Sequence, residues 1–186
     1  MFCDRHVTIS RDNRTSQQFK CGILQKYSVS IYLHSISPED TAMNDVERAV
    51  DIFVNGYSCS QAVCGIFAQR FGLDQDMALK ISGGFGGGMG RLGCVCGALT
   101  GSFMVLGLRY ASAEAGTGEA KLHTYEMVRE AARRFEARNG SMMCHDLLGY
   151  NLDDPAEYLA ASDAGVFRTI CPKLVRSAAE ILEELL

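Results

Sequence analysis

The sequence lacks the long apolar run that a membrane-spanning helix requires. Its longest apolar stretch, residues 103–108, stops at Arg109 and is far shorter than the roughly 20 residues that cross a bilayer. The net charge of −4 gives no indication of a surface that attracts nucleic acid or an anionic membrane. The first residues mix charged and polar side chains, so no signal peptide is visible. These absences argue against membrane insertion and nucleic-acid binding, and they predict a cytoplasmic protein.

The eight cysteines include no C-x-x-C pair. This absence argues against thioredoxin-type redox chemistry and zinc ribbons, and the lack of closely spaced cysteine runs argues against ferredoxin-type sites. Because cytoplasmic thiols stay reduced, we expect metal ligands, redox groups or small buried residues rather than structural disulfides. Cys94 and Cys96 form a C-x-C pair, which can chelate a metal but would make a strained disulfide.

Glycine is concentrated in residues 83–107, which hold ten of the nineteen glycines in the chain. Glycine costs roughly 1 kcal/mol relative to alanine inside a helix, so this density indicates close approach of backbone to backbone or to a ligand. Gly97 and Gly101 lie four residues apart, on one face of a helix predicted over about 96–110. The pattern predicts a glycine-rich turn that delivers a cysteine to the start of a buried helix. The literal GxGxxG at 88–93 lacks the preceding strand of a dinucleotide site.

The chain divides into two segments of different character. Residues 1–42 carry a charge of +1 against −5 for residues 43–186, and their one strand-like stretch, 27–33, has no evident partner strand. We predict a poorly structured N-terminal extension over 1–42, whose cysteines are assigned no role, and a helical cysteine-motif domain over 43–186. One hypothesis is that the native chain starts at Met43.

From residue 43 onward the apolar residues follow the 3.6-residue period of helices, and no strand is evident. The pattern predicts an all-α, compact domain of about five to seven helices. The expected helices lie at about 44–55, 58–71, 74–82, 96–110 and 117–137, with short ones after Ser141 and at Pro155, and a terminal helix from Cys171. The long helix is expected to bury Tyr125, Val128, Ala132 and Phe135, and the third helix Met77, Ala78 and Ile81.

Four cysteines fall at or near the predicted N-termini of four different helices: Cys59, Cys96, Cys144 and Cys171. A helix N-terminus carries about +0.5 charge and free N–H donors, which lower the pKa of a thiol and stabilise its thiolate. Thiolate is the form that attacks disulfides and binds metals. This placement favours a shared site that the fold assembles from distant positions. Cys64 and Cys94 are assigned no role, and His145 is either a ligand beside Cys144 or a partly exposed polar residue.

The same residues resemble a known family. The elements GYSCSQAV, GGFGGGMG, CGALTG, CHDLLG and a last cysteine before the C-terminal helix are similar to the C-GCAxxG-C-C redox-active proteins, over roughly residues 46–186. The resemblance implies signature cysteines at Cys59, Cys96, Cys144 and Cys171, with Gly97, Ala98 and Gly101 completing CGAxxG. Members are small bacterial or archaeal helical proteins often encoded near transporter genes, so a redox protein or a membrane transporter component is an expected partner. A related domain in certain cytochromes holds an iron–sulfur centre.

Three functions stay open. The favoured one is a redox site of the four signature thiolates. It holds an iron–sulfur cluster for electron transfer, with Gly97 and Gly101 beside the cofactor, or it performs thiol–disulfide exchange with a partner through Cys59 and Cys96 while Cys144 and Cys171 relay or resolve. Four thiolates at one point suit a metal better than a two-electron couple. The second is a structural zinc site, made of the same four cysteines, in a non-catalytic interaction module. The third is a partner-binding accessory subunit with incidental cysteines.

Overall fold

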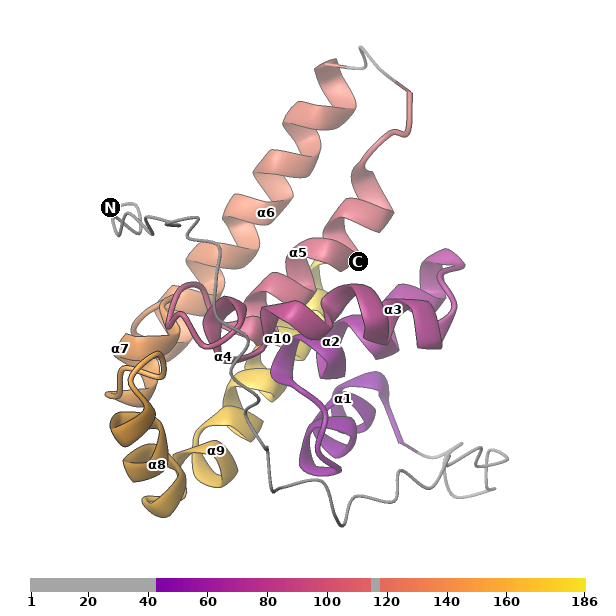
Figure 1. Ribbon diagram of the computed structural model, residues 1–186. Helices are drawn as coiled ribbons and strands as arrows, with labels where there is room; N and C mark the ends of the chain where they lie inside the picture. The colour runs from indigo at the N-terminus through magenta and orange to yellow at the C-terminus, as the bar shows by residue number, and fades with distance from the viewer. Residues whose placement is uncertain (1–42, 115–117) are drawn as a thin grey trace, which may run out of the picture. The chain divides into compact units, whose positions relative to one another are not determined.

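The computed structural model describes residues 43–114 and 118–186, in which the only β-structure is an isolated bridge between Val95 and Met143 (Figure 1). The α-helices of this part are α1 (Asp45–Val54), α2 (Cys59–Phe67), α3 (Gln75–Ser82), α4 (Gly86–Met89), α5 (Gly97–Tyr110), α6 (Gly118–Asn139), α7 (Cys144–Leu148), α8 (Pro155–Asp163), α9 (Val166–Thr169) and α10 (Cys171–Leu185). Two 3-10 helices, η1 (Ala68–Phe71) and η2 (Gly83–Phe85), extend α2 and α3.

The all-α class is confirmed, and seven of these helices have eight residues or more, within the expected number. The single-turn helices α4 and α9 were not expected. The predicted extension, its strand-like stretch and the hypothesis of a start at Met43 lie outside the described residues. No helix in the described part of the chain combines the length and apolar character needed to cross a membrane.

Side-chain caps set where several helices begin. Asn44 accepts a hydrogen bond from the Glu47 amide at the start of α1, and Asp154 caps α8 ahead of its first-turn proline. Ser58 and Gln61 form a reciprocal capping box at the start of α2. Because such a box satisfies two otherwise unpaired backbone donors, it fixes Cys59 as the first residue of α2.

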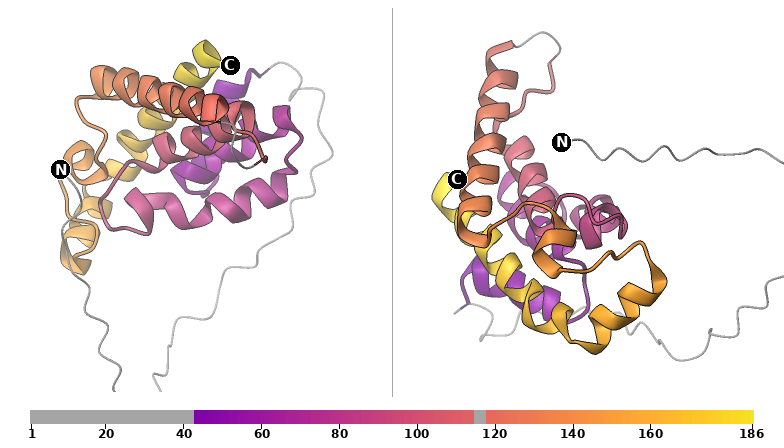
Figure 2. Two further views of the ribbon diagram at one scale, coloured as in Figure 1. Left: turned by 90° about the horizontal axis from the view of Figure 1, so that it is seen from above. Right: turned by 90° about the vertical axis from the view of Figure 1, so that its left-hand side faces the viewer.

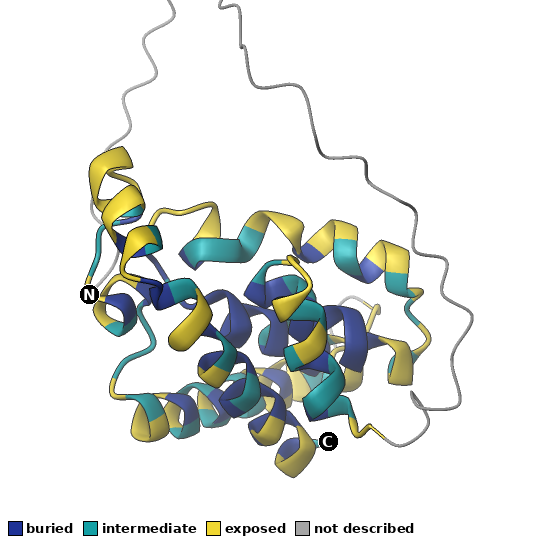
Figure 3. Ribbon diagram, turned by 90° about the horizontal axis from the view of Figure 1, so that it is seen from below, coloured by how far each residue is buried: buried dark blue, intermediate teal, exposed yellow. Residues whose placement is uncertain are grey.

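The main core lies where α2, α5 and α10 meet, and α1 and α6 cover its outer sides (Figure 2). Burial is most complete in α2, where every residue except Gln61 is buried, and the dark blue segments in Figure 3 mark the buried positions of the domain. Its largest fully buried side chains are Phe67, Phe135, Leu99 and Leu106. Burial of apolar surface at about 25 cal/mol per Å² makes this core the principal source of stability.

A second, smaller core joins α7, α8, α9 and the first turn of α10. Its buried residues are Cys144, Leu148, Leu152, Ala161, Val166 and Cys171. This group of short helices lies beside the N-terminal end of α10, next to the glycine turn at α4 (Figure 1). The two cores meet at the candidate site described below.

Two helices are more exposed than the sequence predicted. In α6, Tyr125 is exposed and the buried positions are Thr124, Ala131 and Phe135, so the inward stripe is rotated by about one residue. In α3, Met77 and Ile81 are exposed while Ala78 and Ser82 are buried. Each helix packs by one narrow face: α3 meets α2 through Ala78, Ser82 and Leu79, which lies against Gly65, and this leaves Met77 and Ile81 in solvent.

Candidate functional site

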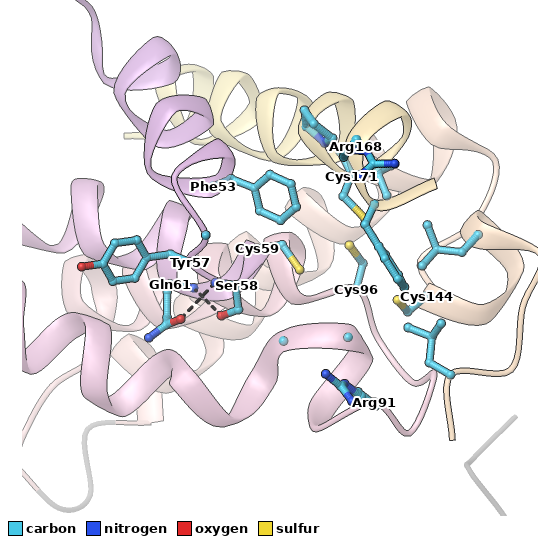
Figure 4. Close-up of a pocket in the computed structure, with 18 of the residues that line it drawn as sticks. Phe53, Tyr57, Ser58, Cys59, Gln61, Arg91, Cys96, Cys144, Arg168 and Cys171 are labelled. Carbon is cyan, nitrogen blue, oxygen red and sulfur yellow. Dashed lines mark hydrogen bonds between the residues drawn. The ribbon is translucent and has the colours of Figure 1, made fainter. Parts of the chain in front are cut away.

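The four cysteines at helix starts line one cavity of about 870 Å³ (Figure 4). Cys59, Cys144 and Cys171 are the first residues of α2, α7 and α10, and Cys96 is the residue before α5. All four are buried, with 2–8% of each residue exposed. Figure 4 shows their side chains pointing toward a common space from different helices. The fold therefore assembles them from positions far apart in the sequence.

Cys59 is the thiol of this set that the structure favours as a thiolate. The Cys96 side chain donates a hydrogen bond to the Cys59 sulfur, which lowers the pKa of Cys59 from its ordinary 9.0 to about 6 against the opposing effect of burial. Backbone amides of Gly87, Cys59 and Ser60 also donate to the sulfur. The two pKa values shift in opposite directions, so a negative charge on this pair is favoured on Cys59 rather than on Cys96.

The other three cysteines behave differently from the sequence prediction that helix N-termini would stabilise their thiolates. The hydrogen bond to Cys59 and burial raise the pKa of Cys96 well above its ordinary value. Burial, followed by repulsion from the Cys59 charge, raises the pKa of Cys144 and of Cys171 to about 12 each. That prediction was wrong for these three because desolvation and a neighbouring negative charge outweigh the helix dipole.

Gly97 and Gly101 let α2 and α5 approach each other closely, as predicted. A Cβ at Gly97 would lie 2.7 Å from the Cys59 Sγ, and one at Gly101 would lie 2.7 Å from the carbonyl oxygen of Ser60. The space beside both glycines is thus filled by α2, including the thiol that takes part in the site. Their contact with a cofactor stays a prediction.

The glycine turn at α4 passes directly over the cysteines. Gly87, Gly88 and Gly90 adopt the left-handed backbone conformation that glycine favours, and Gly87 and Gly90 line the cavity. A Cβ at Gly88 would lie 2.6 Å from the Cys144 Cβ and 2.8 Å from backbone atoms of Cys94. Sequence reasoning placed the turn but did not identify which glycines line the site, because glycine density alone does not show which residues a turn packs against.

An isolated β-bridge ties the segment of Cys96 to the segment of Cys144. The Cys96 amide donates to the Met142 carbonyl at 2.8 Å, and the Cys144 amide donates to the Cys94 carbonyl at 2.7 Å. The His145 ring contacts the Gly93 carbonyl through Nδ1 at 2.7 Å, so it holds the same junction. The sequence contained no strand signal here, since a single bridge needs no alternating pattern.

Cys64 and Cys94 do not line the cavity. Cys64 is fully buried with Ala68 and Ala78 in a third small cluster, where burial raises the pKa of its thiol. Cys94 is buried under the glycine turn, and its backbone carries the bridge to Cys144.

The side chains that could bind a metal do not converge on one point in the described residues. In residues 43–114 and 118–186, no group of three or more His, Cys, Asp or Glu side chains is placed to hold a metal ion. The four thiols share one cavity without closing around a single point.

Comparison with known proteins places the chain in a family. Residues 57–185 match a family model described as "Putative redox-active protein (C_GCAxxG_C_C)". The match spans the capping box of α2, the glycine turn and all four cysteines that line the cavity. The comparisons with curated proteins and with solved structures gave no match. Since the matched residues make up more than half of the chain, this protein belongs to the C_GCAxxG_C_C family of redox-active proteins.

Proposed function

We propose that the protein performs thiol–disulfide exchange, with Cys59 as the attacking thiolate and Cys96 as the resolving thiol. The observation that carries the proposal is the placement of these two residues at the wall of one open cavity, where a Cβ at Gly97, the residue after Cys96, would lie 2.7 Å from the Cys59 Sγ. A disulfide needs two cysteines whose Cα atoms lie within about 7 Å of each other, and the close approach of α5 to α2 at Gly97 favours such a pairing of Cys59 with Cys96. Thiolate character at Cys59 and proton retention at Cys96 match the two roles.

The exchange proceeds in two balanced steps. The Cys59 thiolate attacks one sulfur of a substrate disulfide, forming a mixed disulfide and releasing the other sulfur as a thiolate. Cys96 then gives up its proton and attacks the Cys59 sulfur, which closes the Cys59–Cys96 disulfide and releases the second sulfur. Two electrons pass from the protein to the substrate, which leaves as two thiols after protonation. The reverse sequence oxidises a dithiol.

Disulfide mapping tests this proposal. The fully reduced protein is oxidised in small steps with diamide, quenched in acid, and digested for peptide mass spectrometry without reduction. We expect the first disulfide to join Cys59 and Cys96. Cys59→Ser and Cys96→Ser should abolish it, whereas Cys64→Ala, which removes a buried thiol outside the cavity, should leave it intact. A first disulfide between any other pair would overturn the proposal.

A second candidate function is electron transfer by an iron–sulfur cluster. It is favoured by one observation: Cys144 and Cys171 line the same cavity as the first pair, giving four thiol donors around an 870 Å³ space. Cysteine thiolates are the usual ligands of such clusters, and a bound cluster would supply one-electron redox chemistry. The four residues would hold it from four helix starts. A structural zinc ion suits the site less well, because no three ligands in the described residues converge on one ion.

Metal analysis separates the candidates. Protein purified anaerobically is assayed for iron, acid-labile sulfide and zinc per chain, together with its visible absorbance. Thiol exchange predicts a colourless protein free of iron. Iron and sulfide in equal amounts that disappear in Cys144→Ser would support the cluster, and one zinc per chain without absorbance would support the structural site. Under thiol exchange, Cys144→Ser keeps the ability to form the Cys59–Cys96 disulfide.

A further inference from the structure

Two arginines stand at the cavity that holds the cysteines. Arg91 comes from the end of the glycine turn and Arg168 from α9, and both line the cavity. Figure 4 shows them on opposite sides of the four cysteines. The lining residues in the described part of the chain include no aspartate or glutamate. The permanently charged groups on the described walls of the cavity are therefore both cationic.

These arginines differ from most arginines of the described surface, which are neutralised. Arg70, Arg134 and Arg176 each form ion pairs with glutamate or aspartate on neighbouring helices. Among the described residues, neither Arg91 nor Arg168 has a carboxylate within ion-pair distance. Unneutralised cations at a cavity attract anionic ligands and raise their local concentration.

Arg91 is held in place at its side of the cavity. Its guanidinium lies 4.0 Å from the centre of the Tyr158 ring and donates a hydrogen bond to the Tyr158 hydroxyl at 3.0 Å. Its backbone adopts φ +71°, a left-handed conformation that a non-glycine residue rarely takes. A Cβ at Gly87 would lie 3.1 Å from the Arg91 Cγ, so the neighbouring glycine makes room for the arginine stem. Backbone strain from a left-handed conformation at a non-glycine residue is found most often at functional sites.

The dimensions and depth of the cavity favour a small molecule. Its volume of about 870 Å³ falls within the range of small-molecule sites, and aromatic side chains of Phe53, Tyr57 and Phe167 contribute apolar walls. Cys59 and Cys96 are only 8% and 2% exposed, so a reacting sulfur must enter the cavity to reach them. A disulfide fixed in the surface of a folded protein cannot do so without unfolding locally.

We infer that the substrate of this site is a low-molecular-weight disulfide that carries carboxylate or similar anionic groups, held between Arg91 and Arg168 with its sulfurs over Cys59. The inference rests on the thiol-exchange function proposed above and names its substrate class. The anionic disulfide is the oxidant: its S–S bond breaks, the Cys59–Cys96 S–S bond forms, and it leaves as two anionic thiols. The arginines bind and orient the substrate and take no part in the electron transfer.

A series of three small disulfides of similar size tests the inference. The probes are 3,3′-dithiodipropionate, which is anionic, 2-hydroxyethyl disulfide, which is neutral, and cystamine, which is cationic. The rate of Cys59–Cys96 disulfide formation is measured with the reduced full-length protein by acid quench and peptide mapping. Arg91→Gln and Arg168→Gln should each slow the reaction of the anionic probe by about tenfold at low salt and leave the neutral probe unchanged. Added salt should reduce the effect, because it screens exposed charges.

Two control variants separate charge from structure. Arg91→Lys keeps the charge and should retain most of the rate with the anionic probe. Arg109 lies exposed at the far end of α5, does not line the cavity, and also lacks a carboxylate partner among the described residues. Arg109→Gln should therefore leave the reaction rates with all three probes unchanged.

The outcomes distinguish this inference from the function on which it rests. If diamide closes the Cys59–Cys96 disulfide but the arginine variants react with the anionic probe as fast as the unaltered protein, the inference is overturned and thiol exchange stands. Equal slowing of the neutral probe would also overturn it, since the arginines would then act on the fold. Acceptance of a protein disulfide but of none of the three probes would assign the site to a protein partner. If diamide does not close the Cys59–Cys96 disulfide, the proposed function of thiol–disulfide exchange is itself overturned.

Discussion

The two halves of the cavity present the same residue type in two different chemical states. Cys59 and Cys96 belong to the main core of α2, α5 and α10, whereas Cys144 and Cys171 belong to the smaller core of α7, α8 and α9. The first pair shares a hydrogen bond that makes one member acidic. In the second pair, burial and the charge of Cys59 raise both pKa values to about 12. A helix start is common to both pairs, so it does not decide the reactivity of the thiol.

The difference follows from how closely the backbones meet. In the first half, Gly97 and Gly101 remove the side chains that would keep α5 away from α2, so that α5 packs directly against the Cys59 sulfur at Gly97. In the second half, α7 and the first turn of α10 hold Cys144 and Cys171 in a cluster with apolar side chains such as Leu148 and Leu152, and no side-chain hydrogen bond lowers the pKa of either thiol. Close packing thus creates the reactive pair, and apolar burial keeps the other pair protonated.

The largest expected effect contrasts the two cores. Leu106→Ala, in the sealed main core, should lower the free energy of unfolding by about 3–5 kcal/mol, because it leaves an enclosed void. Leu152→Ala should lower it by about 2 kcal/mol, because Leu152 already borders the cavity and its loss only enlarges that space. Denaturant unfolding of both variants measures the difference. An equal or larger loss of unfolding free energy for Leu152→Ala would contradict the view that the main core is tightly packed and the smaller core is open to the cavity.

The next effect concerns the glycine turn that joins the halves. Gly88→Ala should cost about 2–4 kcal/mol, because its Cβ would overlap Cys144 and Cys94 and its backbone is left-handed. Gly84→Ala in the preceding 3-10 helix η2 is the control: no atom lies within 4 Å of its Cβ position, so the change should stay below about 1 kcal/mol. Thermal and denaturant unfolding measure both. Similar stabilities for the two variants would show that the turn does not pack on Cys144 as described.

A pH-dependent experiment sharpens the comparison of the thiols. The iodoacetamide alkylation rate of Cys59 should rise as the pH increases through about 6 and then level off, since its pKa is lowered to about 6. Cys96→Ala removes the main cause of that shift, so the midpoint should move toward higher pH and the rate at pH 6 should fall by up to about tenfold for each unit of pKa.

Matched variants show whether the low alkylation midpoint of Cys59 depends on Cys96 alone. Cys96→Ser keeps a hydrogen-bond donor and should retain part of the low midpoint. Cys144→Ala should leave the Cys59 midpoint in place, because Cys144 does not contribute to lowering it. In Cys59→Ala, the pKa of Cys144 and of Cys171 should fall, because the charge that repels their thiolates is gone. If the alkylation midpoint of Cys59 is the same with and without Cys96, the interaction between the two thiols is contradicted.

The smallest expected effect lies at a second link between the halves, where Arg91 of the glycine turn contacts Tyr158 of α8. Tyr158→Phe removes one hydrogen bond and keeps the ring under the guanidinium, so stability should fall by about 1 kcal/mol or less. Tyr158→Leu also removes the ring and should slow the reaction with the anionic disulfide more than Tyr158→Phe does. Equal reaction rates for both variants and the unaltered protein would show that Tyr158 does not position Arg91.

Much of the local structure could be predicted from the sequence because it depends on nearby residues. The caps at Ser58 and Asp154 and the close face formed by Gly97 and Gly101 are short-range or periodic signals, and the structure contains them. The rotation of α6, with Tyr125 exposed, could not be predicted well, because a one-residue shift depends on which neighbours a helix meets. The bridge at Val95 and Met143 has no pattern of its own and exists only because the two segments are brought together.

The sequence by itself determined that four cysteines begin helices and that glycines allow those helices to approach, because capping and helical periodicity act over a few residues. Tertiary structure alone decided that Cys59 contacts Cys96, that Cys144 and Cys171 are buried as thiols, and that Arg91 and Arg168 border the same cavity. A thiol pKa depends on burial and on charges and donors within a few ångströms, and helices distant in the chain supply these groups.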